Sequence, residues 1–330
     1  MKKHTHIALA ITLALSGFAA NAQTLLNASY DVAREFYKDY NAAFAAHYKK
    51  TTGQDVKIDQ SHAGSSAQAR AVNDGLAADV VTMNTTTDVQ FLADSGVVAK
   101  DWTKKFPHDA SPTTSTMLFL VRNGNPKNIK DWDDLIKPGV QVVVVNPKTG
   151  GNGRMAYLAA WGYVRSTGGT DAQAAEFVSK LYKNVPVLAR GGRDATGVFL
   201  QRNIGDVLVT FESEVVSVDR EFGAGKVDAI HPSASIVAEN PVAVVERTAA
   251  KKGSGALAKA YLDYLYSPEG QEIAARHNIR PRNEAVLKKY ASAFKPIKLF
   301  TVEQYFGSLG EAQKVHFNDG GQFDKLYTTK

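Results

Sequence analysis

The chain has 330 residues and a formal net charge of +6; 44% of its residues are hydrophobic and 22% are charged. These proportions are typical of a globular protein with about two domains. The sequence has no cysteine, which excludes a disulfide framework, a cysteine nucleophile and thiolate metal sites. It has no basic run interleaved with aromatic residues, so we expect no nucleic-acid partner. Its eight histidines lack close metal-ligand spacing, so we expect no metal and no cofactor.

The chain opens with a pattern typical of a secretory signal peptide. Two lysines precede an apolar run at residues 7–18, and the small-residue pattern Ala-Asn-Ala follows. The run is too short for a membrane anchor, and no later stretch reaches about 18 consecutive apolar residues. We therefore expect residues 1–22 to be removed before Gln23 and the mature protein to be soluble.

The stretch after the leader alternates between strands and helices. Strands are expected at residues 25–30, 56–60 and 80–83. The first helix is expected after Asp31, which suits an N-cap, and ends at Gly53. Later helices are expected at residues 67–72 and around Val89. This βαβαβ order predicts a parallel sheet with helices on both faces.

The second part of the chain repeats the alternation. Strands are expected at residues 116–121, 142–145, 185–188, 207–211, 236–238 and 242–245. Helices are expected at residues 132–136, 155–165, 171–182 and 256–266, around Phe199, and from Pro268 onward. The polar stretch at residues 122–130 is a candidate passage into a second lobe, and residues 236–245 are a candidate return.

Residues 142–153 have the composition of an anion-binding strand–loop–helix unit. Four consecutive valines predict a strand buried on both faces. The Gly-Gly-Asn-Gly sequence at residues 150–153 leaves backbone N–H groups clear of side chains. The N-terminus of the helix that follows favours an anion. A flexible surface loop is the alternative interpretation.

The same arrangement occurs four times. A strand-like run is followed by a turn rich in Gly, Ser or Asp and then by a helix at Asp31, at Ser65, at residues 150–153 and at residues 191–194. Each helix N-terminus has free N–H donors and a partial positive charge. Because strand ends line one crevice in such sheets, two turns from each half can converge on a small dianion. The alternative is that helices in α/β folds commonly begin in this way.

Two other functions have partial support. Residues 151–156 match the pattern G-x-G-x-x-A, with Asp171 near the position of a ribose-binding acid. The mid-chain position and the five residues between the valine strand and Gly151 disfavour a dinucleotide site. Glu212 and Glu214 could form the carboxylate pair of a hydrolase, or cap the helix that follows them. No Gly-x-Ser-x-Gly motif accompanies them, so we expect no enzyme.

Several motifs together resemble those of the periplasmic sulfate- and thiosulfate-binding proteins of ABC importers. They are Ser-Tyr-Asp at residues 29–31, Gln-Ser-His-Ala-Gly-Ser-Ser at 60–66, Asn-Pro-Lys-Thr-Gly-Gly-Asn-Gly-Arg at 146–154, Tyr-Leu-Ala-Ala-Trp-Gly at 157–162, Gly-Asp-Val-Leu at 205–208 and Leu-Tyr-Ser-Pro-Glu-Gly-Gln at 265–271. The resemblance covers the mature chain in order. It implies an α/β, two-lobed periplasmic binding protein of type II, a Venus-flytrap in which each lobe is a doubly wound sheet flanked by helices.

The resemblance also implies that backbone N–H groups hold the ligand in a dehydrated cleft, without a contacting Lys or Arg. Carried over by position, the donors are the amides of Asp31, Ser65, Gly151, Asn152 and Gly192. The anion-binding set also includes Phe211. Five further residues are expected close behind it, namely His62, Thr149, Gly150, Arg154 and Arg193.

Two positions depart from the family's sulfate binders and resemble its thiosulfate-binding branch. The sulfate binders place a serine hydroxyl at the position of Gly150 and a tryptophan indole N–H at that of Phe211. Leaving oxygens of a dianion without donors in a closed site costs on the order of 1–3 kcal/mol per group. Thr149 or the Asn152 amide is a candidate replacement donor. The terminal sulfur of thiosulfate is larger than oxygen and a weaker acceptor, which suits a phenyl wall.

The resemblance therefore implies a monomeric periplasmic receptor that binds thiosulfate and sulfate and delivers them to a membrane-embedded ABC permease. Residues 23–115 and 237–330 are expected to form the first lobe, and residues 116–236 the second. A receptor for another tetrahedral oxyanion, such as molybdate or phosphate, is the alternative within the class. A secreted ester hydrolase that uses Glu212 or Glu214 is the alternative from another class.

Overall fold

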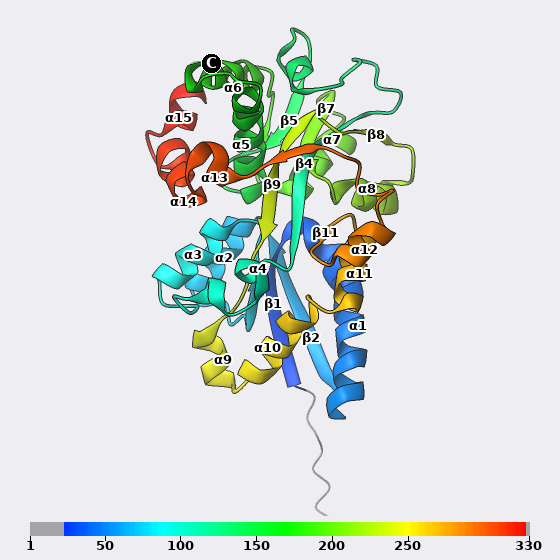
Figure 1. Cartoon of the computed structure of the whole chain (residues 1–330), viewed down its shortest axis with the longest axis vertical. Coiled ribbons are helices and arrows are strands. Elements are labelled where there is room, and N and C mark those ends of the chain that lie inside the picture. The colour runs from blue at the N-terminus through cyan, green and yellow to red at the C-terminus, as the bar shows by residue number, and fades with distance from the viewer. Residues whose placement is uncertain (1–22, 328–330) are drawn as a thin grey trace, which may run out of the picture.

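The computed structural model describes residues 23–327, so the predicted signal peptide lies outside the described residues. Two lobes are stacked along the long axis of the molecule, and each contains a β-sheet flanked by helices (Figure 1). This arrangement confirms the predicted two-lobed α/β fold. Within residues 23–327, no helix combines the length and apolarity required to cross a membrane.

The first lobe is built on a four-stranded sheet with the order β10-β3-β1-β2. Its strands are β1 (Gln23–Tyr30), β2 (Val56–Ala63), β3 (Val80–Thr82) and β10 (Val242–Val244). β1 is parallel to β2 and β3, as predicted, whereas β10 is antiparallel to β3. The helices of this lobe are α1 (Arg34–Thr52), α2 (Ser65–Asn73), α3 (Thr86–Asp94), α4 (Pro107–Ala110), α9 (Glu246–Lys252), α10 (Gly255–Tyr264), α11 (Pro268–Arg276) and α12 (Glu284–Lys289), with 3₁₀ turns η1 (Asp31–Ala33) and η2 (Trp102–Lys104).

The second lobe is built on a mixed sheet with the main order β12-β9-β4-β7-β5-β6, and β8 and β11 also pair with β4. Its strands are β4 (Thr113–Arg122), β5 (Val142–Val145), β6 (Leu188–Ala189), β7 (Val207–Phe211), β8 (Val227–Ile230), β9 (Ala234–Asn240), β11 (Arg280–Pro281) and β12 (Lys298–Phe300). β5 is parallel to β6 and β7, whereas β4 is antiparallel to β7, β8 and β9. The helices are α5 (Gly151–Ser166), α6 (Asp171–Lys183), α7 (Gly192–Leu200), α8 (Glu214–Phe222), α13 (Val302–Phe306), α14 (Leu309–Ala312) and α15 (Gln322–Tyr327), with the 3₁₀ turn η3 (Trp132–Ile136) and the π-helical turn η4 (Gln313–Phe317).

β4 and β9 form an extended antiparallel connection between the lobes (Figure 1). Thr113, at the first-lobe end of β4, lies opposite Asn240 at the end of β9. The chain then enters β10 of the first sheet at Val242. A few residues at such connections absorb the backbone rotation when two lobes close.

The C-terminal part of the chain passes back to the second lobe. The predicted first lobe included residues 237–330, but β12 pairs with β9 and α15 packs on α6. The chain from Lys298 onward therefore lies with the second lobe. Its aromatic side chains explain this placement, because Phe317 and Phe323 pack against Tyr157 of α5.

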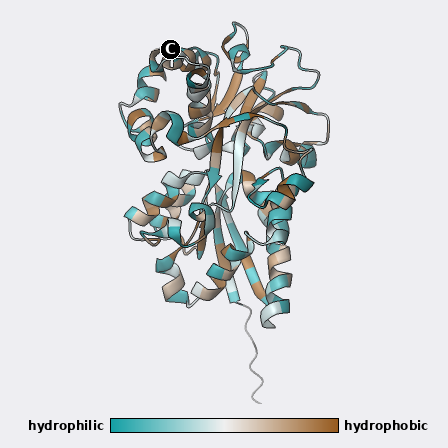
Figure 2. Cartoon of the chain, in the orientation of Figure 1, coloured by the Kyte–Doolittle hydropathy of each residue, from teal (hydrophilic) through white to brown (hydrophobic). Residues whose placement is uncertain are grey.

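β5 and, apart from Thr210, β7 consist of hydrophobic residues, and the strands in the upper part of the second sheet are mostly brown in Figure 2. Every residue of β5 and of β7 is buried. The prediction that the four valines form a strand buried on both faces is thereby confirmed. This rigid strand fixes the start of the loop that leads to α5.

Some local predictions differ from the structure, and others are confirmed. The strand predicted at residues 185–188 is reduced to the two residues of β6. Asp31 begins a 3₁₀ turn, and the N-cap of α1 is Ala33 instead. Gly53 ends α1 in the left-handed conformation, and Ser267 caps α11 through the Gly270 N–H, both as predicted.

Candidate functional site

Three helices that begin at the boundary between the lobes share one kind of start. Among α2, α5 and α7 none has a side-chain cap, and all three N-caps are glycines: Gly64, Gly150 and Gly191. The first residues after these N-caps are buried: Ser65, Gly151 and Gly192. The first amides of a helix have no acceptor within it and form the positive end of its dipole. These termini therefore present N–H donors suited to an anion.

The turns from the two lobes meet. The backbone N–H of Arg193 in the second lobe donates to Asp31 Oδ2 in the first, at 3.1 Å. A Cβ atom on Gly191 would lie 2.7 Å from the same oxygen, and one on Gly64 would lie 3.5 Å from the Thr149 carbonyl oxygen. The structure thus brings all four predicted turns together at the boundary between the lobes, which we call the junction.

The turn after β3 also reaches the junction, and the sequence analysis missed it. A Cβ atom on Gly151 would lie 2.1 Å from Asn84 Oδ1 and 2.6 Å from Thr85 Cγ2. Both side chains are almost fully buried, and the Asn84 N–H donates to Ser65 Oγ at 3.3 Å. Because Asn84 closely follows a strand of the first sheet, the rule that strand ends line the crevice would have identified it. Only glycine at position 151 permits this approach between the lobes.

Asp31 places a carboxyl group at the junction. Burial raises the pKa of its carboxyl, while the backbone N–H groups of Arg193 and Val32 act in the opposite direction. The Val32 N–H donates to Asp31 Oδ1 at 3.0 Å, and the backbone N–H of Arg193 donates to Oδ2. The carboxylate therefore holds the first turn of α7 from the opposite lobe, with both oxygens accepting amides of the protein itself.

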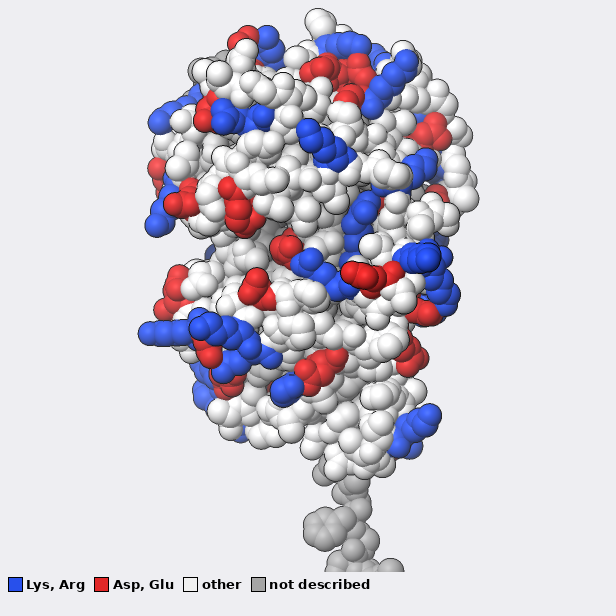
Figure 3. Space-filling model, in the orientation of Figure 1, with Lys and Arg blue, Asp and Glu red and all other residues white. Residues whose placement is uncertain are grey.

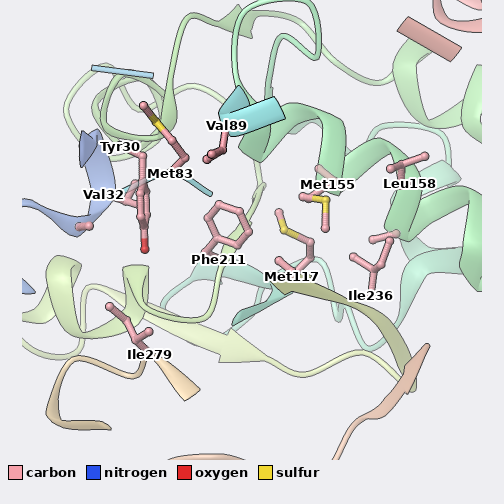
Figure 4. Close-up of a cluster of buried hydrophobic side chains, with 14 of the residues drawn as sticks. Tyr30, Val32, Met83, Val89, Met117, Met155, Leu158, Phe211, Ile236 and Ile279 are labelled. Carbon is pink, nitrogen blue, oxygen red and sulfur yellow. The ribbon is translucent and has the colours of Figure 1, made fainter. Parts of the chain in front are cut away.

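Phe211 lies in an apolar cluster beside these turns. It ends β7 opposite Met117 of β4 and is only 1% exposed. Its ring lies in the same cluster as Tyr30, Met83 and Met155 (Figure 4). Because Tyr30 directly precedes Asp31, the cluster forms an apolar wall next to the junction.

Arg154 links the lobes through a buried ion pair. Its Nη2 lies 2.8 Å from Asp88 Oδ1 of α3, and the two side chains are 8% and 6% exposed. The same nitrogen donates to Ser66 Oγ at 2.6 Å. Burial alone would raise the pKa of Asp88, but the charge of Arg154 and hydrogen bonds from Arg154 and Thr85 bring it below its ordinary value. The protein's own carboxylate thus neutralises this guanidinium.

Thr149 and Asn152 are the expected replacements for the missing side-chain donors. Thr149 Oγ1 donates to the Arg190 carbonyl oxygen at 3.1 Å. Asn152 Nδ2 donates to Thr210 Oγ1 at 3.1 Å. A hydroxyl has one proton and an amide NH₂ has two. Asn152 therefore retains a second N–H, whereas the Thr149 proton is already used.

His62 and Arg193 bring no uncompensated positive charge to the junction. His62 is half-buried at the end of β2 and contacts Gln60. Burial, together with the charge of Arg34, lowers its pKa to about 4, so the imidazole is neutral at pH 7. The Arg193 guanidinium pairs with Glu221. On the face shown in Figure 3, acidic and basic side chains are interspersed over both lobes.

Glu212 and Glu214 have separate partners and do not form a carboxylate pair. Glu212 Oε2 lies 2.8 Å from Arg280 Nε, whereas Glu214 Oε2 accepts a hydrogen bond from Thr196 Oγ1 at 2.6 Å. Neither glutamate caps α8, whose N-cap is Ser213 without a side-chain hydrogen bond; of the capping alternative, only the position of Glu214 in the first turn of α8 is confirmed. Within the part of the chain that the structure describes, no group of three or more His, Cys, Asp or Glu is placed to hold a metal.

Glu214 gives a testable pH dependence. Burial raises its pKa from 4.5 to about 7, against the hydrogen bond from Thr196. Between these values the folded protein keeps a proton that the unfolded chain has released, so stability falls as pH rises through this window. Glu214→Gln should therefore stabilise the protein by about 2–3 kcal/mol more at pH 8 than at pH 5. Urea denaturation at both pH values measures the difference, and an equal change at both would contradict it.

The comparisons with known sequences agree with this geometry. The family model described as bacterial extracellular solute-binding protein matches residues 25–280. A thiosulfate-binding protein from Pseudomonas aeruginosa is 56% identical, with 97% of each chain covered. A sulfate-binding protein from Escherichia coli is 50% identical, covering 97% of this chain and 98% of its own. A thiosulfate-binding protein from Escherichia coli is 45% identical, covering 98% and 96%. Overall sequence identity therefore does not distinguish the relatives named for sulfate from those named for thiosulfate.

Solved structures agree as well. A sulfate-binding protein from Mycobacterium tuberculosis H37Rv has a TM-score of 0.82 and 30% identity, covering 90% of this chain and 100% of its own. A periplasmic thiamin binding protein shares the fold, with a TM-score of 0.67 and 16% identity over 93% of this chain and 96% of its own. The relatives are named as binding proteins rather than enzymes, as expected for this chain. The chain belongs to the sulfate/thiosulfate-binding protein family of the bacterial extracellular solute-binding proteins.

Proposed function

We propose that this protein is a receptor that binds thiosulfate and sulfate at the junction. One observation carries the proposal: three glycine-capped helix N-termini from both lobes meet there without capping side chains. The names of the relatives support this ligand class. The donors are the backbone N–H groups of Asp31, Ser65, Gly151, Asn152 and Gly192.

The energetics support a ligand of this size. A helix N-terminus contributes up to about 2 kcal/mol to holding an anion in a partly buried site. Several termini and the hydrogen bonds of their amides support a micromolar Kd, which corresponds to about −8 kcal/mol. Closure of the lobes about β4 and β9 removes water and strengthens each contact.

Selectivity against phosphate follows from the proton count of the ligand. Sulfate and thiosulfate have no proton to donate at neutral pH, whereas hydrogen phosphate brings a hydroxyl that needs an acceptor. The carboxylate of Asp31 offers no free acceptor at the junction, because the Val32 and Arg193 amides already occupy its two oxygens. A phosphate hydroxyl would therefore displace one of these bonds or compete for the buried amide oxygens of Asn84 and Asn152, which accept no hydrogen bond in the structure, whereas sulfate and thiosulfate need no acceptor.

The side chains at the junction favour thiosulfate. Gly150 carries no hydroxyl, and the Thr149 hydroxyl is already bonded to Arg190. The phenyl ring of Phe211 and the thioether of Met117 form an apolar wall. A large, weakly accepting sulfur atom loses less than an oxygen when it faces such a wall.

Parallel titration calorimetry of the purified mature protein tests the proposed function. Thiosulfate and sulfate should each bind one-to-one, and phosphate should bind about 5- to 150-fold more weakly, since an unsatisfied hydroxyl costs about 1–3 kcal/mol. Phosphate that binds as tightly as thiosulfate would overturn the proposal. Absence of heat with all three anions would overturn it as well.

Phe211→Trp should shift selectivity toward sulfate. An indole N–H adds one donor to the wall, and one hydrogen bond in such a site is worth about 1 kcal/mol, or about fivefold in Kd. The ratio of sulfate to thiosulfate affinity is the quantity to compare, because any general strain from the larger ring cancels in it. An unchanged ratio would show that Phe211 does not line the ligand site.

Export and delivery complete the proposed function. Residues 1–22 are proposed to act as a cleaved signal peptide that places the protein in the periplasm. The closed, anion-loaded monomer would then dock on a membrane-embedded ABC permease and release its ligand there. We propose lobe boundaries near residues 115 and 237, with residues from 298 onward assigned to the second lobe.

A further inference from the structure

The C-terminal segment of the second lobe lies directly behind the loop that leads into α5. This segment comprises η4 and α15, at residues 313–327. Phe317 and Phe323 anchor it, since both are buried and pack against Tyr157 of α5. The segment therefore has a fixed position relative to α5.

Lys148 joins the loop to this segment. Its ammonium group lies 2.8 Å from Asp324 Oδ2, 3.2 Å from the Asn318 carbonyl oxygen and 3.5 Å from Asp319 Oδ1. A lysine ammonium has three protons, so these three acceptors match its full donor capacity. The Lys148 side chain is 25% exposed and that of Asp324 is 32% exposed. The hydrogen bond from Lys148 lowers the pKa of Asp324, so this carboxylate is ionised at neutral pH.

Arg154 joins the other end of the loop to the same segment. Its Nη1 donates to Gln313 Oε1 at 3.2 Å, while its Nη2 is held by Asp88 and Ser66 of the first lobe. Gly150 and the first residues of α5, Gly151 and Asn152, thus lie between two side chains that are both tied to the C-terminal segment. Neither tie uses a backbone amide of the loop.

We propose that residues 313–324 act as a clasp that positions the N–H donors of the loop, with Lys148 as the main positioning residue. This inference rests on the proposed function, because it concerns the donors assigned to the anion. Three glycines, at the N-cap (position 150) and in the first turn of α5 (positions 151 and 153), give this stretch a large conformational entropy to lose. A loop already held in its binding geometry loses less entropy when the ligand arrives, which lowers Kd.

The test compares Lys148→Met and Lys148→Arg with the wild type. Lys148→Met should weaken thiosulfate binding about fivefold, the factor expected for a partly buried ion pair, with most of the change in the dissociation rate. Lys148→Arg keeps the charge and should recover most of the affinity. The thiosulfate Kd of the double variant Lys148→Met/Asp324→Asn should lie within about twofold of that of Lys148→Met, because both variants lack the same ion pair. Lys180→Met, which removes an exposed ion pair with Glu176 on α6, is the matched control and should change nothing.

Amide hydrogen exchange of the unliganded proteins separates positioning from general stability. In Lys148→Met the amides of residues 150–153 should exchange faster, while those of α6 remain unchanged. Unchanged exchange and unchanged thiosulfate dissociation would overturn the clasp. Equal acceleration throughout the second lobe would also overturn it, because the role would then be structural. If the wild type binds neither thiosulfate nor sulfate, the proposed function fails. The exchange data still test whether the clasp holds residues 150–153 in place.

Discussion

Replacing Gly151 with alanine should weaken thiosulfate binding by about 100-fold, as expected when a new methyl group overlaps a packed contact by more than an ångström. The added Cβ would lie 2.1 Å from Asn84 Oδ1 and 2.6 Å from Thr85 Cγ2. Both neighbours belong to the first lobe and are buried, so neither has room to move aside in the closed form. The clash therefore destabilises the closed form. The unliganded protein avoids the clash by opening, so its unfolding temperature should be unchanged.

Gly255→Ala is the matched control for this substitution. Gly255 is the first residue of α10, just as Gly151 is the first residue of α5, and apart from its chain neighbours and the backbone of its own helix no atom lies within 4 Å of its hypothetical Cβ. This variant should bind thiosulfate like the wild type in the same calorimetric titration. Equal affinities of Gly151→Ala and the wild type would show that the lobes do not close with this geometry.

Removing the guanidinium of Arg154 should have an effect of similar size. Arg154→Met leaves Asp88 buried without its partner in the closed form, and breaking one side of a buried pair costs about 3–5 kcal/mol. An open form lets Asp88 reach water, so the cost falls on closure and hence on affinity. We expect thiosulfate Kd to rise on the order of 100-fold.

A double-mutant cycle identifies the cause of this loss. In Arg154→Met/Asp88→Asn the buried charge is absent from both sides, so the double variant should bind more tightly than Arg154→Met alone. Titration calorimetry of the four proteins gives the coupling free energy. If the two single effects simply add, Arg154 and Asp88 do not act as a pair across the lobes.

The turns that form the junction were predictable because each has a local signature. Glycines at positions 64, 150 and 191 precede helices and follow strands, and all three are N-caps in the structure. Asn84 lacks the glycine signature, and its position just after a strand of the first sheet indicates only that it lies at the crevice, without identifying its partner. Its role depends on Gly151, which lies 67 positions later in the sequence (151 − 84). Pairings across lobes of this kind are set by tertiary packing, which local patterns do not encode.

The same reason explains the other differences. Arg154 was expected near the site, but its partner Asp88 was not identified, because the two lie on helices of different lobes. The C-terminal segment contains aromatic residues that fit either lobe by composition, and only their packing on Tyr157 places them in the second. Asp31 suits an N-cap by residue type, yet its carboxylate is bonded to the Arg193 amide of the opposite lobe.

The central claim is that backbone amides from both lobes hold the anion. Two-dimensional amide NMR of ¹⁵N-labelled protein, titrated with thiosulfate, tests it most directly. The amide protons of Ser65, Gly151, Asn152 and Gly192 should shift downfield together and saturate at one equivalent of ligand, while that of Gly255 stays in place. Binding that leaves these amides unshifted would contradict the account.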